Sequence, residues 1–234
     1  MKWTLITGGA IRLGAEIAKE LACAGHNIVI HYNHSRDAAE KLVKELQNYG
    51  VKAELIQGDF SSRKSVDDFL SRYNFDTEYL IHNVGNYLID MPLNTPIKAW
   101  EELFQTNLFA PVQITQKLSS SIIKNRGRII TIGVTGINSV RADTYATAYT
   151  QTKASLLGYT KGLAKELANL GVTVNMVSPG RLENAVDLPE DPKSDPMGRP
   201  GKLSEITRVI KFLLEPESAY ITGQNIEVAG ALRL

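Results

Sequence analysis

Tyr149 and Lys153 have the residue types and the spacing of a proton-donating pair. They stand four positions apart in a segment with a helical pattern, so both side chains should project from one face of the helix. The pKa of a free phenol is about 10, and a neighbouring ammonium lowers it because it stabilises the phenolate. Such a pair is typical of a general acid. The same spacing also occurs where a tyrosine packs in the core and a lysine lies in solvent, so a second motif has to support this interpretation.

The second motif is a glycine-rich turn near the amino end of the chain. A short apolar strand leads into Thr-Gly-Gly-Ala-Ile-Arg-Leu-Gly, residues 7–14, and an amphipathic segment follows. Gly8 permits a tight turn, Gly14 permits a helix to pack closely on a strand, and the free amides at the helix start attract an anion. We therefore predict that the turn holds the pyrophosphate of a dinucleotide through Gly8, Arg12 and Leu13. The spacing departs from G-x-G-x-x-G, because Arg12 stands where a glycine is common.

The composition fits one folded domain over residues 1–234. The 234 residues are 43% hydrophobic, the net charge is +1, and no linker or repeat interrupts the chain. This charge gives no reason to expect nucleic acid or a membrane as a partner. The chain opens on a strand without a signal sequence and has one cysteine, Cys23. We expect a cytoplasmic protein with Cys23 as a small core residue. We expect no metal site, because His31 and His34 lack further ligands at matching spacing.

Seven short apolar segments have the pattern of strands and alternate with amphipathic helical segments. The predicted strands are residues 3–7, 27–32, 52–57, 78–82, 128–132, 172–177 and 224–228. This alternation predicts an α/β protein, a single-domain Rossmann fold with a doubly wound seven-stranded parallel sheet and helices on both faces. Ligands of such sheets bind beyond the carboxyl ends of the strands. The glycine-rich turn and the segments that follow the later strands should therefore border one crevice.

The order of these motifs resembles the short-chain dehydrogenase/reductase family along nearly the whole chain. The matching landmarks are the turn at 7–14, Gly58-Asp59-Phe60, Asn83-Val84-Gly85, Asn107, Tyr149-x-x-x-Lys153 and Ser178-Pro179-Gly180. The resemblance implies an NADP-dependent oxidoreductase that transfers hydride between the nicotinamide and a carbonyl or imine. It also implies that Tyr149 is the acid, that Lys153 holds the nicotinamide ribose, and that Asn107 completes a proton relay through water.

The same resemblance implies contacts at the adenosine end of the cofactor. The carboxylate of Asp59 is expected to contact the adenine with the backbone of Phe60 alongside, although Asp59 can also serve as a helix cap. The backbone from Asn83 to Gly85 is expected to pass beside the adenosine ribose.

The segment after the second strand favours NADP over NAD. An acidic side chain there would bind a ribose diol and repel a 2′-phosphate, and none stands at the strand tip. His34, Ser35 and Arg36 follow instead, and they can supply charge and donors to that phosphate. An ordinary solvated helix start is the alternative.

One landmark of the family is missing, the serine after the fifth strand. Gly133 is aligned with it in the run Ile-Gly-Val-Thr-Gly at 132–136. Glycine offers no side-chain donor to a carbonyl oxygen, and loss of one such donor costs about 3 kcal/mol in the barrier of other enzymes. Thr135 is the first candidate to replace it.

Three details resemble the pteridine reductases within the family. These are the run Thr-Gly-Gly-Ala-x-Arg-Leu-Gly, the run His-Tyr-x-x-Ser, and Tyr87 beyond the Asn-Val-Gly turn. They imply that Arg12 faces the substrate and that Tyr87 stacks on a pterin, although Arg12 can instead brace the pyrophosphate and Tyr87 can cover a loop. The aspartate usual in those enzymes is absent. Two alternatives remain: a β-ketoacyl-acyl-carrier-protein reductase, with the basic residues Lys124, Arg126 and Arg128 in support, and a catalytically weak NADP-binding sensor or scaffold.

The long segment 178–202 is rich in proline and acidic residues. It is too long for a plain connector, and we expect it to close over a small-molecule substrate. Pro179 and Gly180 should border the cofactor, and Asn184 stands where relatives often contact the nicotinamide carboxamide. The resemblance also implies a homodimer or homotetramer.

Overall fold

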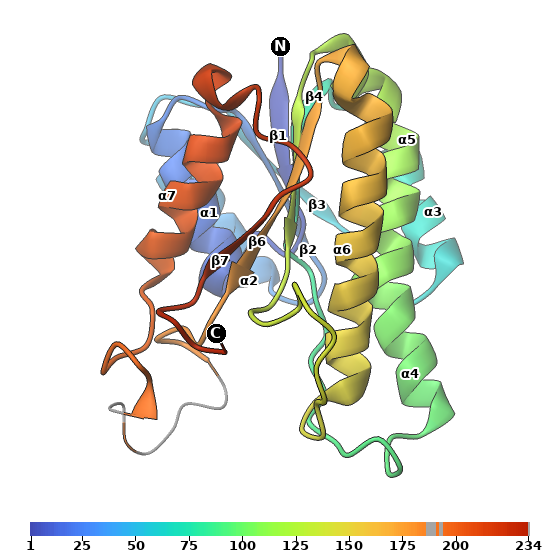
Figure 1. The fold of residues 1–234 in the computed structure, drawn as a ribbon. Coiled ribbons are helices and arrows are strands. Elements are labelled where there is room, and N and C mark those ends of the chain that lie inside the picture. The colour runs from blue at the N-terminus through green and yellow to red at the C-terminus, as the bar shows by residue number, and fades with distance from the viewer. Residues whose placement is uncertain (186–190, 192–193, 234) are drawn as a thin grey trace.

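The computed structural model describes residues 1–185, 191 and 194–233, which form one sheet with helices on both sides (Figure 1). The strands are β1 (Trp3–Ile6), β2 (Ile28–Tyr32), β3 (Ala53–Gln57), β4 (Thr77–His82), β5 (Arg128–Ile132), β6 (Thr173–Pro179) and β7 (Asn225–Val228). The α-helices are α1 (Arg12–Cys23), α2 (Arg36–Gln47), α3 (Arg63–Arg72), α4 (Ile97–Phe104), α5 (Ala110–Lys124), α6 (Thr147–Leu167) and α7 (Leu203–Leu214). A π-helix, η1 (Gln105–Phe109), joins α4 to α5, and short 3-10 turns lie at η2 (Ala168–Leu170) and η4 (Pro216–Ser218).

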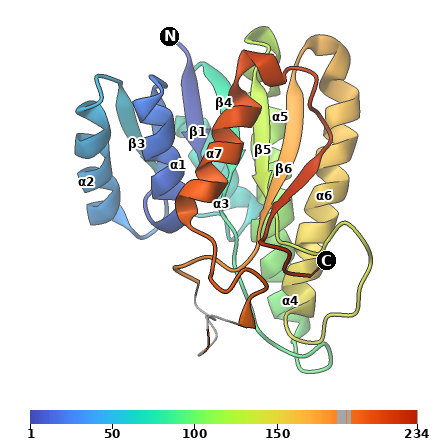
Figure 2. The ribbon, with the colours of Figure 1, turned by 60° about the vertical axis from the view of Figure 1, so that its left-hand side comes forward.

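The strands pair in the order β3-β2-β1-β4-β5-β6-β7, and every pair is parallel. Because β1 lies between β2 and β4, the chain winds outward to β3 and then crosses back to β4. This reversal is the topological switch point at which open α/β sheets bind ligands. The predicted doubly wound Rossmann fold is confirmed (Figure 2).

Two layers of helices cover the sheet because each helix carries an apolar stripe. Helices α1, α2 and α7 pack on one face and α3, α5 and α6 on the other (Figure 1). Buried side chains that join these helices to the sheet are Ile17, Leu46 and Ile210 on the first face and Phe69, Ile114 and Leu167 on the second. Burial of each such side chain contributes roughly 1.5–3 kcal/mol. The two layers thus hold the carboxyl ends of the strands in a defined arrangement.

The predicted strands are all present, with ends shifted by at most two residues. The largest shift is at β6, which runs on to Pro179 and so extends beside the segment after β5. The prediction for Cys23 was wrong. Cys23 is the last residue of α1 and is exposed, because Leu21 and Ala22 take the buried positions of that turn.

Candidate active site

A crevice of about 740 Å³ opens at the carboxyl ends of the strands. It is bordered by the glycine-rich turn, the segments after β4, β5 and β6, and the first turns of α6. The predicted site residues that line it are Gly8, Arg12, Leu13, Asn83, Gly85, Tyr87, Gly133, Thr135, Tyr149, Lys153, Pro179 and Gly180. The structure therefore brings most of the predicted residues to one place.

The glycine-rich turn has the backbone geometry that the sequence predicts. Gly8 has φ +61°, in the left-handed region that favours glycine. A Cβ atom on Gly14 would lie 2.1 Å from the carbonyl oxygen of Gly8, so no side chain fits there. Arg12, the first residue of α1, also has a left-handed φ of +53°, a conformation that costs energy for a residue with a side chain.

Two side chains hold this turn in place, His31 and Asn83, and sequence reasoning missed this role of both. The Nδ1 atom of His31 accepts the Gly8 N–H at 3.0 Å, and its Nε2 atom lies 3.1 Å from the carbonyl oxygen of Gly58. This arrangement requires the neutral tautomer with the proton on Nε2. Burial lowers the pKa of His31 to about 4, so the neutral form persists at physiological pH. Asn83 adds a second brace, because its Nδ2 donates to the carbonyl oxygens of Thr7 and Gly8 at 3.1 and 3.0 Å.

Tyr149 and Lys153 lie one turn apart on α6 and face the crevice together. The Lys153 Nζ atom lies 5.8 Å from the centroid of the Tyr149 ring and donates to the carbonyl oxygen of Ile132 at 2.8 Å. The Lys153 side chain is almost completely buried, and this burial lowers its pKa to about 8. A cation near a phenol favours the phenolate form, and this is the arrangement that the proton-donor prediction requires.

Asn107 lies in the π-helix between α4 and α5. Pro111, near the start of α5, has no N–H to donate to the carbonyl of Asn107, which explains why regular α-helical bonding is interrupted here. The side-chain amide of Asn107 accepts the N–H of Asn86 at 2.7 Å and donates to the carbonyl of Asn86 at 2.9 Å and to the Thr152 hydroxyl at 3.0 Å. Asn107 thus joins the segment after β4 to α6, while its part in a proton relay stays a prediction.

At Gly133, the position aligned with the missing serine, the structure leaves little space for a side chain. A Cβ atom on Gly133 would lie 2.3 Å from the Ser178 hydroxyl and 2.5 Å from the Met176 sulfur, so a serine does not fit. The ladder with β6 continues past β5, since Gly133 donates to the carbonyl of Val177 at 2.9 Å and Thr135 to that of Pro179 at 3.0 Å.

Side chains alternate along such an extended segment. Val134 is therefore directed away from Ser178, and it lines the same crevice as Tyr149. Its isopropyl group offers no hydrogen bond to a substrate oxygen.

Thr135 is not free to replace the missing donor. Its hydroxyl is 2.7 Å from the carboxylate of Glu227 and 3.0 Å from the carbonyl oxygen of Leu232, both on the C-terminal side of the chain. A hydroxyl has one hydrogen to donate, and both neighbours are acceptors. The prediction that Thr135 donates to the substrate therefore conflicts with these contacts.

An aromatic ring and a cation border the other side of the crevice. The Tyr87 ring meets the Tyr149 ring edge-to-face, with centroids 4.7 Å apart and an angle of 82° between the planes. Tyr87 is 41% exposed, so part of its ring surface remains accessible. Arg12 also lines the crevice, and its guanidinium donates to the carbonyl oxygen of Asn184 at 3.1 Å. The contact joins the glycine-rich turn to the segment after β6.

Of the residues predicted at the adenosine end, Asn83 and Gly85 line this crevice, whereas Asp59 and Phe60 lie beyond its lining. Asp59 accepts the N–H of Ser61 at 3.0 Å, and hydrogen bonds from Ser61 lower the pKa of its carboxyl group. The side chain that caps α3 is Ser62 rather than Asp59. The Phe60 ring stacks on His31, with centroids 4.0 Å apart, and belongs to the core. Only the backbone of Phe60 is thus left for a ligand.

His34 and Ser35 lie in the link from β2 to α2, and Arg36 is the first residue of α2. Ser35 precedes the helix, and the exposed guanidinium of Arg36 pairs with Glu40 at 2.8 Å. An exposed ion pair at this spacing is weak, so Arg36 remains available to an anion.

The expected substrate loop at 178–202 is partly outside the described residues, which omit 186–190 and 192–193. Its start belongs to the sheet, because Pro179 ends β6 and Gly180 donates to the carbonyl of Val228 at 3.1 Å. A Cβ on Gly180 would lie 2.7 Å from the backbone of Ala229, so only glycine fits there.

Comparisons with known proteins identify the family. The family model described as enoyl-(acyl carrier protein) reductase matches residues 9–232. The chain is 34% identical over 243 residues to the 3-oxoacyl-acyl-carrier-protein reductase FabG of Aquifex aeolicus, covering 99% of this chain and 97% of that protein. It is 30% identical over 240 residues to the uncharacterized oxidoreductase YmfI of Bacillus subtilis, covering 98% of each. The chain belongs to the short-chain dehydrogenase/reductase family of oxidoreductases.

A solved structure agrees with this assignment. The blue fluorescent protein from a metagenomic library, in complex with NADPH, superposes with a TM-score of 0.89 at 28% identity, covering 98% of this chain and 96% of that one. Within the described ranges, no helix is long and apolar enough to cross a membrane, and no three His, Cys, Asp or Glu side chains are grouped to hold a metal ion.

Proposed function

We propose that the protein is an NADPH-dependent reductase of a small conjugated carbonyl or imine, with Tyr149 as the proton donor. The observation that carries the proposal is the buried Lys153 beneath the Tyr149 phenol in the crevice beside the glycine-rich turn. Lys153 favours the phenolate that remains after proton release. The crevice is large enough for a nicotinamide and a small substrate, since ligand pockets commonly measure ~300–1,000 Å³. A homodimer or homotetramer remains a prediction from the family.

The chain's own residues fit a dinucleotide. The close approach of Gly14 to Gly8 leaves no room for a side chain at Gly14, in the first turn of α1. The free amides at the start of a helix attract an anion such as a pyrophosphate. When bound, NADPH supplies the hydride. The backbone of Gly8, Arg12 and Leu13 would hold its pyrophosphate, and the Lys153 side chain its nicotinamide ribose. Solved relatives such as the NADPH-bound blue fluorescent protein support the choice of cofactor.

The substrate class follows from the walls of the crevice. The accessible ring of Tyr87 offers a flat apolar surface next to the proton donor, and Arg12 offers a cation at the mouth. A planar, polar heterocycle such as a dihydropterin would stack on the first and accept a hydrogen bond from the second at its carbonyl oxygen or ring nitrogen. Val134 adds no second donor for a substrate oxygen. A C=N bond that takes its proton from Tyr149 alone therefore suits this site.

A 3-oxoacyl thioester is the second candidate, because the Aquifex relative carries that activity in its name. The basic residues that the sequence associates with a carrier protein do not support it. Arg128 begins β5, at the opposite end of the sheet from the crevice, and its guanidinium is buried against backbone carbonyls such as that of Gly171. Lys124 pairs with Asp76 at 3.2 Å. A carrier protein would have to dock elsewhere.

The deciding experiment is NADPH oxidation by the purified chain with 7,8-dihydrobiopterin, 7,8-dihydromonapterin and an acetoacetyl thioester as separate substrates. We expect turnover with the pterins. Turnover with the thioester alone would replace the pterin assignment with fatty-acid chemistry. NADPH binding without turnover of any of them would support the sensor or scaffold.

The rate of reduction should fall as the pH rises through about 8, because the pKa of the buried Lys153 is lowered to about 8. Below that pH the ammonium is present and favours release of the Tyr149 proton. Above it the amine is neutral and the phenol is a weaker acid. The pH profile of kcat/KM for the reduced substrate measures this effect. The guanidinium of Lys153→Arg does not titrate in this range, so the fall in kcat/KM above about pH 8 should disappear in this variant. If the same fall persists, the titration of Lys153 is not its cause.

Arg36 should select NADPH over NADH. Its pair with Glu40 is exposed, so the guanidinium can turn to a 2′-phosphate at little cost. We expect Arg36→Ala to weaken NADPH binding about tenfold, the value of one hydrogen bond to a charged group, and to leave NADH binding unchanged. Fluorescence titrations with both cofactors measure the ratio. Lys41→Ala, which removes an exposed cation farther along α2, is the control and should not change it. Equal loss for both cofactors would contradict this role.

A further inference from the structure

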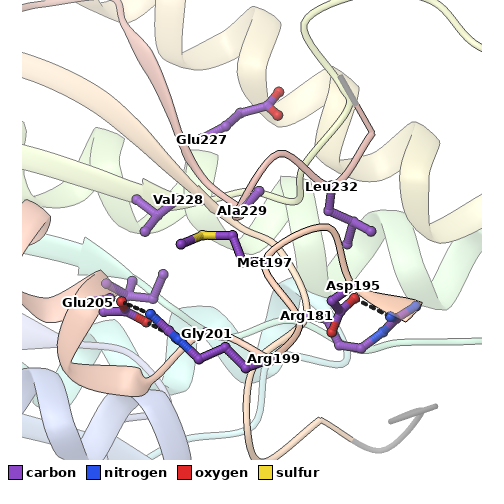
Figure 3. Close-up of a pocket in the computed structure, with 12 residues that line it drawn as sticks. Arg181, Asp195, Met197, Arg199, Gly201, Glu205, Glu227, Val228, Ala229 and Leu232 are labelled. Atoms are coloured by element: carbon purple, nitrogen blue, oxygen red, sulfur yellow. Dashed lines mark hydrogen bonds and ion pairs between the residues drawn. The ribbon is translucent and has the colours of Figure 1, made fainter. Parts of the chain in front are cut away.

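Glu227 lies on β7 and borders a small pocket that also contains two ion pairs. Figure 3 shows its carboxylate pointing away from two ion pairs that line the same small pocket. Those pairs join Arg181 to Asp195 and Arg199 to Glu205, so each of these arginines already has a carboxylate partner. Glu227 takes its contacts from a different part of the molecule.

The Glu227 carboxylate accepts three hydrogen bonds from the segment after β5. The donors are the Thr135 hydroxyl at 2.7 Å, the Gly136 N–H at 3.1 Å and the Asn138 side-chain amide at 2.9 Å. Hydrogen bonds to an ionised carboxylate are stronger than those between neutral groups. Three of them within four residues hold this segment against β7.

A series of side-chain hydrogen bonds continues from Asn138 to Ser178. The Asn225 amide donates to the Asn138 amide oxygen at 2.9 Å and accepts the Ser178 hydroxyl at 2.6 Å. Ser178 is the side chain that fills the space next to Gly133. The series of hydrogen bonds that joins Ser178, Asn225, Asn138 and Glu227 therefore explains two features. It fills the space where a side chain on residue 133 would lie, and it fixes the orientation of the residues that follow.

The C-terminal turn is fastened to the same segment. The Leu232 carbonyl lies 3.0 Å from the Thr135 hydroxyl, and Arg141 donates to the Arg233 carbonyl at 2.6 Å. Arg233 has a left-handed φ of +64°, which is costly for a residue with a side chain. Leu232 and Arg233 both line the crevice. The segment after β5 and the end of the chain thus form one wall of it.

We propose that Glu227 is a positioning residue that fastens residues 135–138 and the C-terminal turn together as the substrate-side wall of the crevice. The inference rests on the proposed function, since it assigns this wall to the substrate that Tyr149 protonates. The glycine-rich turn has its own supports, His31 and Asn83. Loss of the Glu227 contacts should therefore impair the positioning of the substrate and leave the binding of NADPH unchanged.

Glu227→Ala and Glu227→Gln form the matched pair of variants. Glutamine keeps an oxygen for Gly136 and Asn138, and its amide can donate to the Thr135 hydroxyl, which then turns its hydrogen to Leu232. Alanine removes every one of these contacts. We expect Glu227→Ala to lower kcat/KM for the substrate by about tenfold to a hundredfold, as small misplacements do, with NADPH affinity unchanged. Glu227→Gln should stay close to the natural protein.

Hydrogen exchange at residues 133–141 provides a readout that needs no substrate. Exchange should become faster in Glu227→Ala and stay slow in Glu227→Gln. The proposal is overturned if the alanine variant keeps natural exchange and kcat/KM, or if the glutamine variant behaves like the alanine one. A chain that reduces no substrate would refute the proposed function, while the exchange comparison would still decide whether Glu227 holds this wall.

Discussion

Tyr149→Phe should lower kcat by about a hundredfold to ten-thousandfold, the usual contribution of a positioned general acid. The substitution removes one hydroxyl and keeps the ring, so the edge-to-face contact with Tyr87 is retained. Lys153 also keeps its hydrogen bond to the Ile132 carbonyl. NADPH affinity and thermal stability should therefore stay unchanged while turnover is lost. Steady-state rates and fluorescence titration of NADPH measure the two properties separately.

Tyr145→Phe is the matched control, because Tyr145 precedes α6, is 49% exposed and is not among the residues that line the crevice. It should keep full activity. Natural turnover in Tyr149→Phe would remove Tyr149 from the mechanism, and equal loss in both variants would point to a general effect on this part of the chain.

Gly14→Ala should abolish measurable NADPH binding. The new Cβ would lie 2.1 Å from the Gly8 carbonyl oxygen and 2.9 Å from the Gly9 Cα. Both contacts are backbone atoms, so the turn itself has to move, and overpacking of this kind typically costs about 1–3 kcal/mol in stability. Displacement of the turn also moves the amides that face the pyrophosphate. Thermal unfolding and NADPH titration measure the two effects.

Gly158→Ala is the control for the change of residue type. Gly158 lies in α6, and a Cβ added there meets no heavy atom within 4 Å. Alanine is the better helix former by roughly 0.5–1 kcal/mol, so this variant should bind NADPH normally and unfold no earlier. Normal NADPH affinity in Gly14→Ala would show that the cofactor does not use the glycine-rich turn.

The sheet was predictable from the sequence because each strand and each helix has a hydrophobic pattern that can be read within its own short segment. Inner parallel strands such as β5 and β6 are buried on both faces and read as largely apolar runs, and the helix of Tyr149 and Lys153 has its own periodicity. The crevice follows from the strand order alone.

The errors at the site have a common physical origin in contacts between distant residues. The Thr135 hydroxyl is engaged by Glu227, 92 residues away, and the space at Gly133 is filled by Ser178 on the neighbouring strand. The support of the turn by His31 depends on the pairing of β1 with β2. Inspection of one segment at a time cannot reveal such contacts.

Transfer of deuterium from NADPH labelled at C4 of the nicotinamide to the reduced product tests the central claim most directly. The purified chain would be incubated with the labelled cofactor and 7,8-dihydrobiopterin, and the product analysed by mass spectrometry. A reductase that binds NADPH in this crevice should yield a product one deuterium heavier. Tight NADPH binding with no deuterium in any product, for the pterins and the acetoacetyl thioester alike, would contradict the account and leave a protein that binds the cofactor without using it.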